Sequence, residues 1–229
     1  MKSVSIAFVV FTLALLGFST YQALVVAPTE QTMGEVQRIF YYHVPSAWVA
    51  GLCFFVNFLA SVAYLVKRTS NADALAVSSA EVGVVFCTIV LITGPIWARP
   101  VWGIWWTWDA RLTTTLVLWL IYVSYLVLRK YAAGGQTAVL AAALAIFGFV
   151  DVPIVYMSIR WFRTQHPSPV MGGGENSGLA PEMLHAFLWN LLAFTCVGIV
   201  LVAARYRLQR MEDQVEAAHA QLALQGGSR

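Results

Sequence analysis

The stretch WGIWWTWDAR, residues 102–111, separates two long apolar segments and is the densest cluster of tryptophan in this chain. Of the nine tryptophans, five fall within twelve residues, and these are Trp97, Trp102, Trp105, Trp106 and Trp108. Tryptophan is enriched where membrane spans meet lipid headgroups, so an aromatic belt is one interpretation. A belt needs only one or two tryptophans at each span end, whereas this run predicts a surface for a flat ligand.

The chain on either side of this stretch is unusually apolar. It is 59% hydrophobic and 11% charged, whereas soluble domains have roughly 45–50% and 25%. A membrane span needs about 20 consecutive apolar residues, and six stretches qualify: residues 4–27, 44–66, 75–97, 112–128, 137–159 and 184–204. We therefore predict an all-α, polytopic integral membrane protein with six transmembrane helices. Residues 1–204 would form the membrane domain, with the tryptophan-rich loop at 97–111.

The basic residues predict the orientation of the spans. An N-terminus in the cytoplasm puts nine lysines and arginines on that side and five outside, and positive charge favours the cytoplasmic side. Both termini are therefore expected in the cytoplasm and the tryptophan-rich loop outside. Residues 205–229 would form a cytoplasmic helical tail, because apolar residues recur there at spacings of three and four. The net charge of +3 is spread over loops and does not indicate a nucleic-acid partner.

Several polar or reactive side chains lie within the predicted spans. Cys53, Cys87 and Cys196 have no CxxC pairing and are interpreted as small buried residues. Glu81 either pairs within the bundle or relays protons, since a carboxylate in a membrane is costly. Asp151 lies next but one to a proline in the fifth span, and it is expected either to bond the backbone group that the proline frees or to mark a kink.

The residues around the tryptophan-rich loop carry signals for helix ends. Gly94, Pro95 and Pro100 are expected to end the third span. Asp109 most simply caps the fourth span, its carboxylate accepting from free amides of the first turn. If the loop is a short helix lying flat, Asp109 shares a face with Trp102, Trp105 and Trp106, and if it is irregular that face does not exist.

Two histidines are predicted on the same side as this loop. His43 lies at the mouth of the second span, beside Pro45 as the helix start, and His166 ends the segment WFRTQH. A structural alternative for His43 is an interfacial residue bonded to backbone or headgroup. Five arginines share that side: Arg38, Arg99, Arg111, Arg160 and Arg163. Imidazoles, aromatic planes and cations together match haem, whose iron takes axial histidine and whose propionates pair with arginine.

Residues 102–111 also resemble the WWD signature, W-G-x-W-W-x-W-D-x-R, of the haem-handling membrane proteins of cytochrome c maturation. The segments HVP (43–45) and WFRTQH (161–166) are similar to those of the haem exporter protein C branch, CcmC. The resemblance implies that His43 and His166 are axial ligands of haem b, and that Arg38 and Arg111 contact its propionates. It implies that the macrocycle rests on the surface formed by Trp102, Trp105, Trp106, Trp108 and Asp109.

The same resemblance implies a location and a set of partners. The protein would lie in the cell inner membrane, with the haem site on the periplasmic side. Its partners would be the periplasmic haem chaperone CcmE, the small protein CcmD and the ABC transporter subunits CcmA and CcmB. His185 matches no family role and is interpreted as structural.

Three hypotheses remain open from the sequence. The favoured one is a protein that binds haem at the outer face and delivers it to a chaperone. The second is a transporter that moves haem or another amphiphile across the bilayer by itself, and the third is a structural subunit whose tryptophans dock a partner. None of the three involves catalysis, so an enzyme is not expected.

Overall fold

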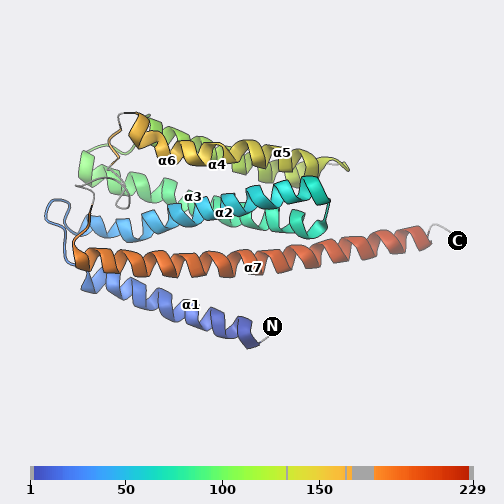
Figure 1. Ribbon diagram of the computed structural model, residues 1–229, viewed down its shortest axis with the longest axis horizontal. Helices are drawn as coiled ribbons and strands as arrows, with labels where there is room; N and C mark the ends of the chain where they lie inside the picture. Colours follow the sequence, from blue (N-terminus) through green and yellow to red (C-terminus); the bar gives the residue numbers. More distant parts are fainter. Residues whose placement is uncertain (1–2, 133, 163, 167–177, 227–229) are drawn as a thin grey trace.

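The computed structural model describes residues 3–132, 134–162, 164–166 and 178–226, and this part of the chain contains helices and no strand (Figure 1). In chain order the elements are α1 (Ser3–Tyr21), the π-helical turn η1 (Gln22–Val26), the 3₁₀ turn η2 (Glu35–Ile39), α2 (Phe40–Lys67), α3 (Ser70–Trp102), α4 (Ala110–Tyr131), α5 (Thr137–Phe149), α6 (Asp151–Trp161) and α7 (Pro181–Gly226).

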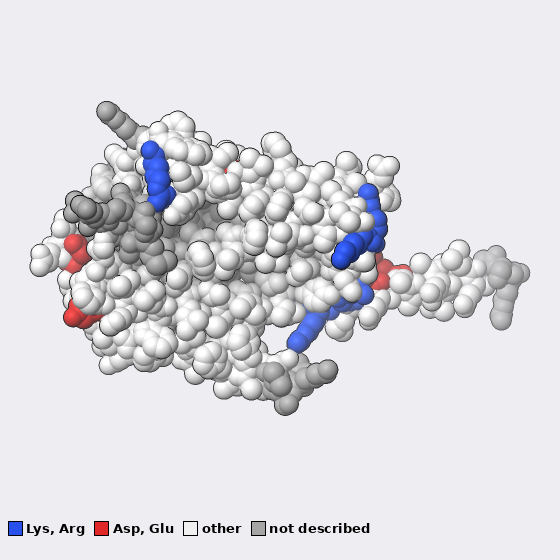
Figure 2. Space-filling view, in the orientation of Figure 1, with Lys and Arg blue, Asp and Glu red and all other residues white. Residues whose placement is uncertain are grey.

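Six helical segments are long and apolar enough to cross a membrane. One is formed by α1 with η1, one by α5 with α6, and the others by α2, α3, α4 and α7. Charged side chains on the face shown in Figure 2 gather toward the two ends and leave an uncharged middle. The prediction of an all-α integral membrane protein with six spans is confirmed.

The α2–α3 hairpin is the centre of the bundle, and α4, α5 and α7 pack around it. Its helices approach closely at Gly83, where an added Cβ would lie 2.6 Å from Cε1 of Phe54. Phe54 in turn stacks on Tyr122 of α4 at a centroid distance of 3.8 Å. The core is therefore built on small residues and stacked rings, as in membrane bundles whose helices associate through close packing.

The expected end of the third span at Gly94, Pro95 and Pro100 is wrong. α3 runs through both prolines to Trp102 and ends at Gly103, whose φ of 79° suits a residue without a side chain. In a membrane bundle, neighbouring groups can form hydrogen bonds with the backbone carbonyls that a proline leaves without a partner, so a helix can continue through a proline. At the true end, Gly103 N–H donates to the Arg99 carbonyl, and the Arg99 guanidinium donates to the Gly103 carbonyl. The last turn of α3, which ends at Trp102, therefore belongs to the third span and not to the tryptophan-rich loop.

Two other prolines lie inside helices, Pro45 in α2 and Pro153 in α6. Pro45 does not start α2, which begins at Phe40 after η2, so the predicted helix start is wrong. In the fifth span, α5 and α6 are separated only by Val150, which keeps helical angles of φ −58° and ψ −30°, so whether the region of Asp151 is kinked stays a prediction.

The polar residues of the spans are largely paired. Glu81 forms a bidentate ion pair with Arg205 of α7, through Nε to Oε2 and through Nη2 to Oε1 at 3.1 Å. This confirms pairing within the bundle for Glu81. The three cysteines are free and buried, as expected. α7 is one continuous helix of 46 residues, so no helix end marks the predicted start of the tail at residue 205.

The connections that follow η1, α3 and α6 lie at one end of the bundle, and both termini point toward the other (Figure 1). This places the tryptophan-rich loop, the start of α2 and the WFRTQH segment at the same end. Which end faces the cytoplasm stays a prediction from the basic residues.

Candidate functional site

His43 lies in the first turn of α2 and faces α3. Its side chain is buried, and Nδ1 lies 2.8 Å from Oγ1 of Thr93. The Trp97 ring packs edge-on at 5.9 Å between centroids, and an added Cβ on Gly94 would lie 3.5 Å from Cε1 of His43. The imidazole is therefore held by one face of α3, and its polar partner is a side chain rather than backbone.

His166 is connected to the tryptophan-rich loop through Asp109. The Asp109 carboxylate accepts from Leu112 N–H at 2.9 Å with one oxygen, which confirms the predicted cap of α4. Its other oxygen accepts from the Thr164 hydroxyl at 2.7 Å. That hydroxyl oxygen accepts from His166 N–H at 3.1 Å, closing a short local turn. One carboxylate thus joins the start of α4 to the segment that carries His166.

Arg111 is the second residue of α4 and points across to α6. Its Nη1 donates to the Val155 carbonyl at 2.5 Å and more weakly to that of Tyr156 at 3.4 Å. Among the described residues Arg111 forms no salt bridge, so its charge is not neutralised by a contacting carboxylate. His43 lies within electrostatic range of both Arg111 and His166. Three predicted site residues, from α2, α4 and the segment after α6, therefore lie in the same region at this end of the bundle.

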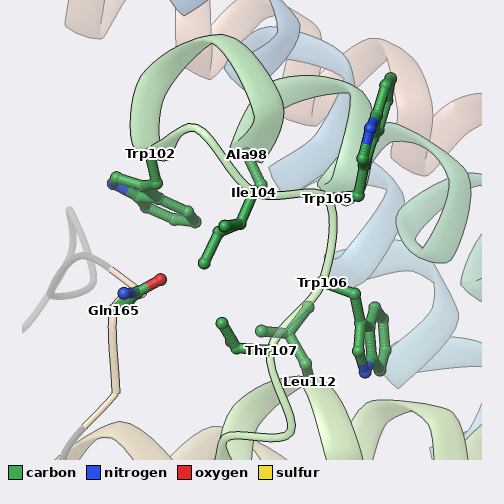
Figure 3. Close-up of a pocket in the computed structure, with 8 residues that line it drawn as sticks. All are labelled: Ala98, Trp102, Ile104, Trp105, Trp106, Thr107, Leu112 and Gln165. Atoms are coloured by element: carbon green, nitrogen blue, oxygen red, sulfur yellow. The ribbon is translucent and has the colours of Figure 1, made fainter.

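The tryptophans do not form one flat wall. Residues 103–109 are irregular, so of the two alternatives predicted for this loop the one without a shared helical face applies. In Figure 3, Trp102 and Ile104 point toward Gln165, whereas Trp105 and Trp106 extend from the other side of the loop. The Trp108 ring is 76% exposed and meets Trp106 edge-on at 5.6 Å. The hollow among these residues has room for about one water molecule, far less than an ordinary ligand pocket. A large planar ligand would therefore lie over these rings rather than inside.

Arg38 is placed differently from the other predicted residues. Its guanidinium forms a salt bridge with Glu35 and donates to the carbonyls of Ala23, at 2.6 Å, and Ala27, at 3.1 Å. These contacts bind η2 to the end of η1, and no contact of the described residues joins Arg38 to His43. Its expected contact with a propionate stays a prediction.

Sequence reasoning missed three side chains at this site: Thr93, Thr164 and Gln165. Thr93 did not stand out as a site residue, because the sequence predicts that the third span ends beside it. Its signal is that it lies one helical turn before Trp97 and so shares a helix face with it. Thr164 carried a usable signal, because a threonine hydroxyl often accepts a hydrogen bond from the backbone N–H two residues later, which here is that of His166. Gln165 carried none.

The arrangement can coordinate a metal only in a limited way. In the described part of the chain, no group of three or more His, Cys, Asp or Glu side chains could hold a metal ion. Two imidazoles suffice only when the metal brings its other ligands with it. An unneutralised arginine and exposed indoles add sites for an anion and for an apolar ring.

Fold and site together define a polytopic membrane protein with a shallow aromatic surface, two histidines and an arginine without a salt bridge among the described residues, all at one end of its bundle. The sequence matches the family described as "Heme exporter protein C", CcmC, over residues 1–221, and the chain belongs to this family. A heme exporter protein C from Bradyrhizobium diazoefficiens is 35% identical over 90% of this chain and 78% of its own length. One from Haemophilus influenzae is 32% identical over 91% and 85%. A putative cytochrome c biosynthesis ccmC-like mitochondrial protein from Marchantia polymorpha is 33% identical over 82% and 80%.

Proposed function

We propose that this protein binds haem b at the periplasmic face of the inner membrane and delivers it to the chaperone CcmE during cytochrome c maturation. Membership of the heme exporter protein C family supports haem handling in general. The observation that carries the specific proposal is the convergence of His43, His166 and Arg111 from three separate segments.

The side chains at this end fit haem in three respects. Two imidazoles supply axial ligands to an iron whose four equatorial positions the porphyrin fills. Arg111, with only carbonyls as hydrogen-bond partners in the described chain, supplies a cation for a propionate. The indole nitrogens of Trp97 and Trp106 are buried and lack a hydrogen-bond partner among the described residues. Such donors favour a ligand that brings acceptor atoms.

The shallow site suits a protein that loads and releases its ligand. Trp102, Trp105 and Trp108 remain exposed, so haem bound over them would keep one edge accessible to a partner. Delivery to CcmE requires that access, and CcmD, CcmA and CcmB are the proposed partners within the membrane. The chain binds and transfers haem in this proposal and makes or breaks no bond in it.

Unassisted transport across the bilayer is less well supported. A transport path needs polar residues that are free at mid-depth. Glu81 is paired with Arg205, and the buried amides of Asn57 and Asn190 donate to backbone carbonyls of Ala76 and Ser19. These polar groups hold helices together. Asp151 keeps one buried carboxylate oxygen without a hydrogen-bond partner among the described residues, and one such group does not form a path.

The proposal is tested by the absorption spectrum of the full chain purified from haem-replete cells. The wild type is expected to show a low-spin, six-coordinate haem, and His43→Ala and His166→Ala are each expected to abolish that signature. His185→Ala, at the start of α7, is the matched control and should retain it. A wild type without low-spin haem, or a signature that survives both substitutions, overturns the proposal.

Delivery is tested separately by mixing the loaded protein with purified CcmE and following haem on the chaperone. Haem should move from the wild type to CcmE, and retention of all haem by the membrane protein would contradict delivery. Haem uptake by proteoliposomes that contain this chain and no ATPase would instead favour transport.

A further inference from the structure

We propose that Thr93 is a positioning residue that fixes the tautomer of His43, so that Nδ1 carries the proton and Nε2 is presented for haem iron. The inference deepens the proposed function and rests on it. It is based on the hydrogen bonds around one threonine hydroxyl and on a second threonine of the same helix with the same geometry.

The proton of the Thr93 hydroxyl has a partner within its own helix. Oγ1 lies 2.7 Å from the carbonyl oxygen of Ile89, one turn earlier, and 2.8 Å from Nδ1 of His43. A hydroxyl has one proton to donate and lone pairs to accept with. With its proton directed to Ile89, Thr93 accepts at Nδ1, and the imidazole must be protonated there.

Thr88, also in α3, provides an internal comparison. Its Oγ1 lies 2.8 Å from the carbonyl of Val84 and 2.8 Å from Nε1 of Trp119. An indole nitrogen can only donate, so Thr88 accepts from a ring N–H while donating to the carbonyl one turn earlier. Thr93 and His43 repeat these distances, and the same assignment of donor and acceptor applies to them.

The assignment leaves the other ring nitrogen with its lone pair. The two nitrogens are separated by Cε1, so Nε2 points in a different direction from the bond between Nδ1 and Thr93. Burial of the ring and the edge-on contact with Trp97 oppose its rotation. A neutral imidazole with a hydrogen-bonded Nδ1–H is the usual state of a metal-binding histidine, because the bond fixes its orientation and raises its basicity.

The test compares Thr93→Val with Thr93→Ser and with Thr88→Val in the haem-loaded full chain. Valine matches the shape of threonine and removes the acceptor, so T93V should release haem about 10–100-fold more readily, the usual effect of losing such a partner. Its haem midpoint potential should rise, because a less basic axial ligand stabilises ferric iron less. T93S keeps the hydroxyl and should behave as the wild type. T88V removes an equivalent hydroxyl remote from His43 and should leave the spectrum and the potential unchanged.

The outcomes separate this inference from the proposed function. A wild type that carries no low-spin haem contradicts the function itself. A wild type that carries it, with T93V equal to T93S in haem release and potential, overturns only the role of Thr93. If T93V does not accumulate, Thr93→Ala removes the same acceptor without placing a second methyl beside the ring, and the same comparison with T93S decides.

Discussion

Replacing Asp109 by alanine is expected to weaken haem binding by releasing the segment that carries His166, without unfolding the bundle. The carboxylate has two functions in the structure. It caps α4 through Leu112 N–H, and it accepts from the Thr164 hydroxyl, which itself accepts from His166 N–H. Loss of the first function affects stability, and loss of the second affects the ligand segment.

The two effects differ in size. Loss of an N-cap costs about 1 kcal/mol. A hydrogen bond to a charged acceptor contributes about 1.5–3 kcal/mol, and the lower value applies because Asp109 is only half-buried. If about 1.5 kcal/mol holds the His166 segment in place, its loss lowers haem affinity about tenfold. Asp109→Ala should therefore lose about 2–3 kcal/mol of stability in total.

The assay is the rate at which haem passes from detergent-solubilised protein to an excess of a high-affinity haem acceptor. Thr164→Val leaves the cap and removes both the bond to Asp109 and the acceptor of His166 N–H, so it should release haem at least as fast as Asp109→Ala does. Thr69→Ala removes the side-chain cap of α3, which accepts from Ala72 N–H and has no connection to His166. It should lower the unfolding temperature and leave haem release unchanged.

A double variant with both Asp109→Ala and Thr164→Val should release haem no faster than Thr164→Val alone, because Thr164→Val already breaks the link that Asp109→Ala breaks. Additive effects, or wild-type release by both single variants, would refute the reasoning.

Two further predictions concern the bundle and are read by thermal unfolding in detergent. Asp73→Asn should cost about 3 kcal/mol, because it leaves Arg129 without the bidentate partner that it holds at 2.6 and 2.7 Å, whereas replacing both residues by leucine and methionine should cost much less. If the single and double variants unfold alike, the pair is not coupled as the structure indicates. Gly83→Ala should cost about 1–3 kcal/mol, because its Cβ would meet Phe54 at 2.6 Å. Gly51→Ala in α2, with nothing within 4 Å, is its control, and equal unfolding temperatures would contradict this packing.

Local features of the sequence predicted much of the fold. Six apolar stretches became six membrane-spanning segments, because their length and composition suffice for a span whatever their neighbours. Asp109 caps α4, since this effect depends on backbone groups within one turn. For Glu81 the sequence predicts either an ion pair within the bundle or a proton relay. It does not identify Arg205 as the partner, because that residue is 124 positions away and meets Glu81 only through helix packing.

The site depended more on tertiary structure. The sequence by itself identified His43, His166 and Arg111 as candidates. Their residue types suit haem, and the number of spans between them puts all three on the same side of the membrane. It did not determine that α3 continues through Pro95 and Pro100, because surrounding helices compensate for a proline's lost bond in ways no local pattern records.

Packing alone decided the partner of His43 and the bond that holds the His166 segment to the start of α4. Thr93 meets His43 from 50 residues away, and Thr164 meets Asp109 from 55 residues away. Whether a tryptophan points into the pocket, as Trp102 does, or away from it follows from the irregular backbone of residues 103–109. Helices and caps form from contacts along the chain and can be predicted from it, whereas the orientation of a side chain in a site is set by residues distant in sequence.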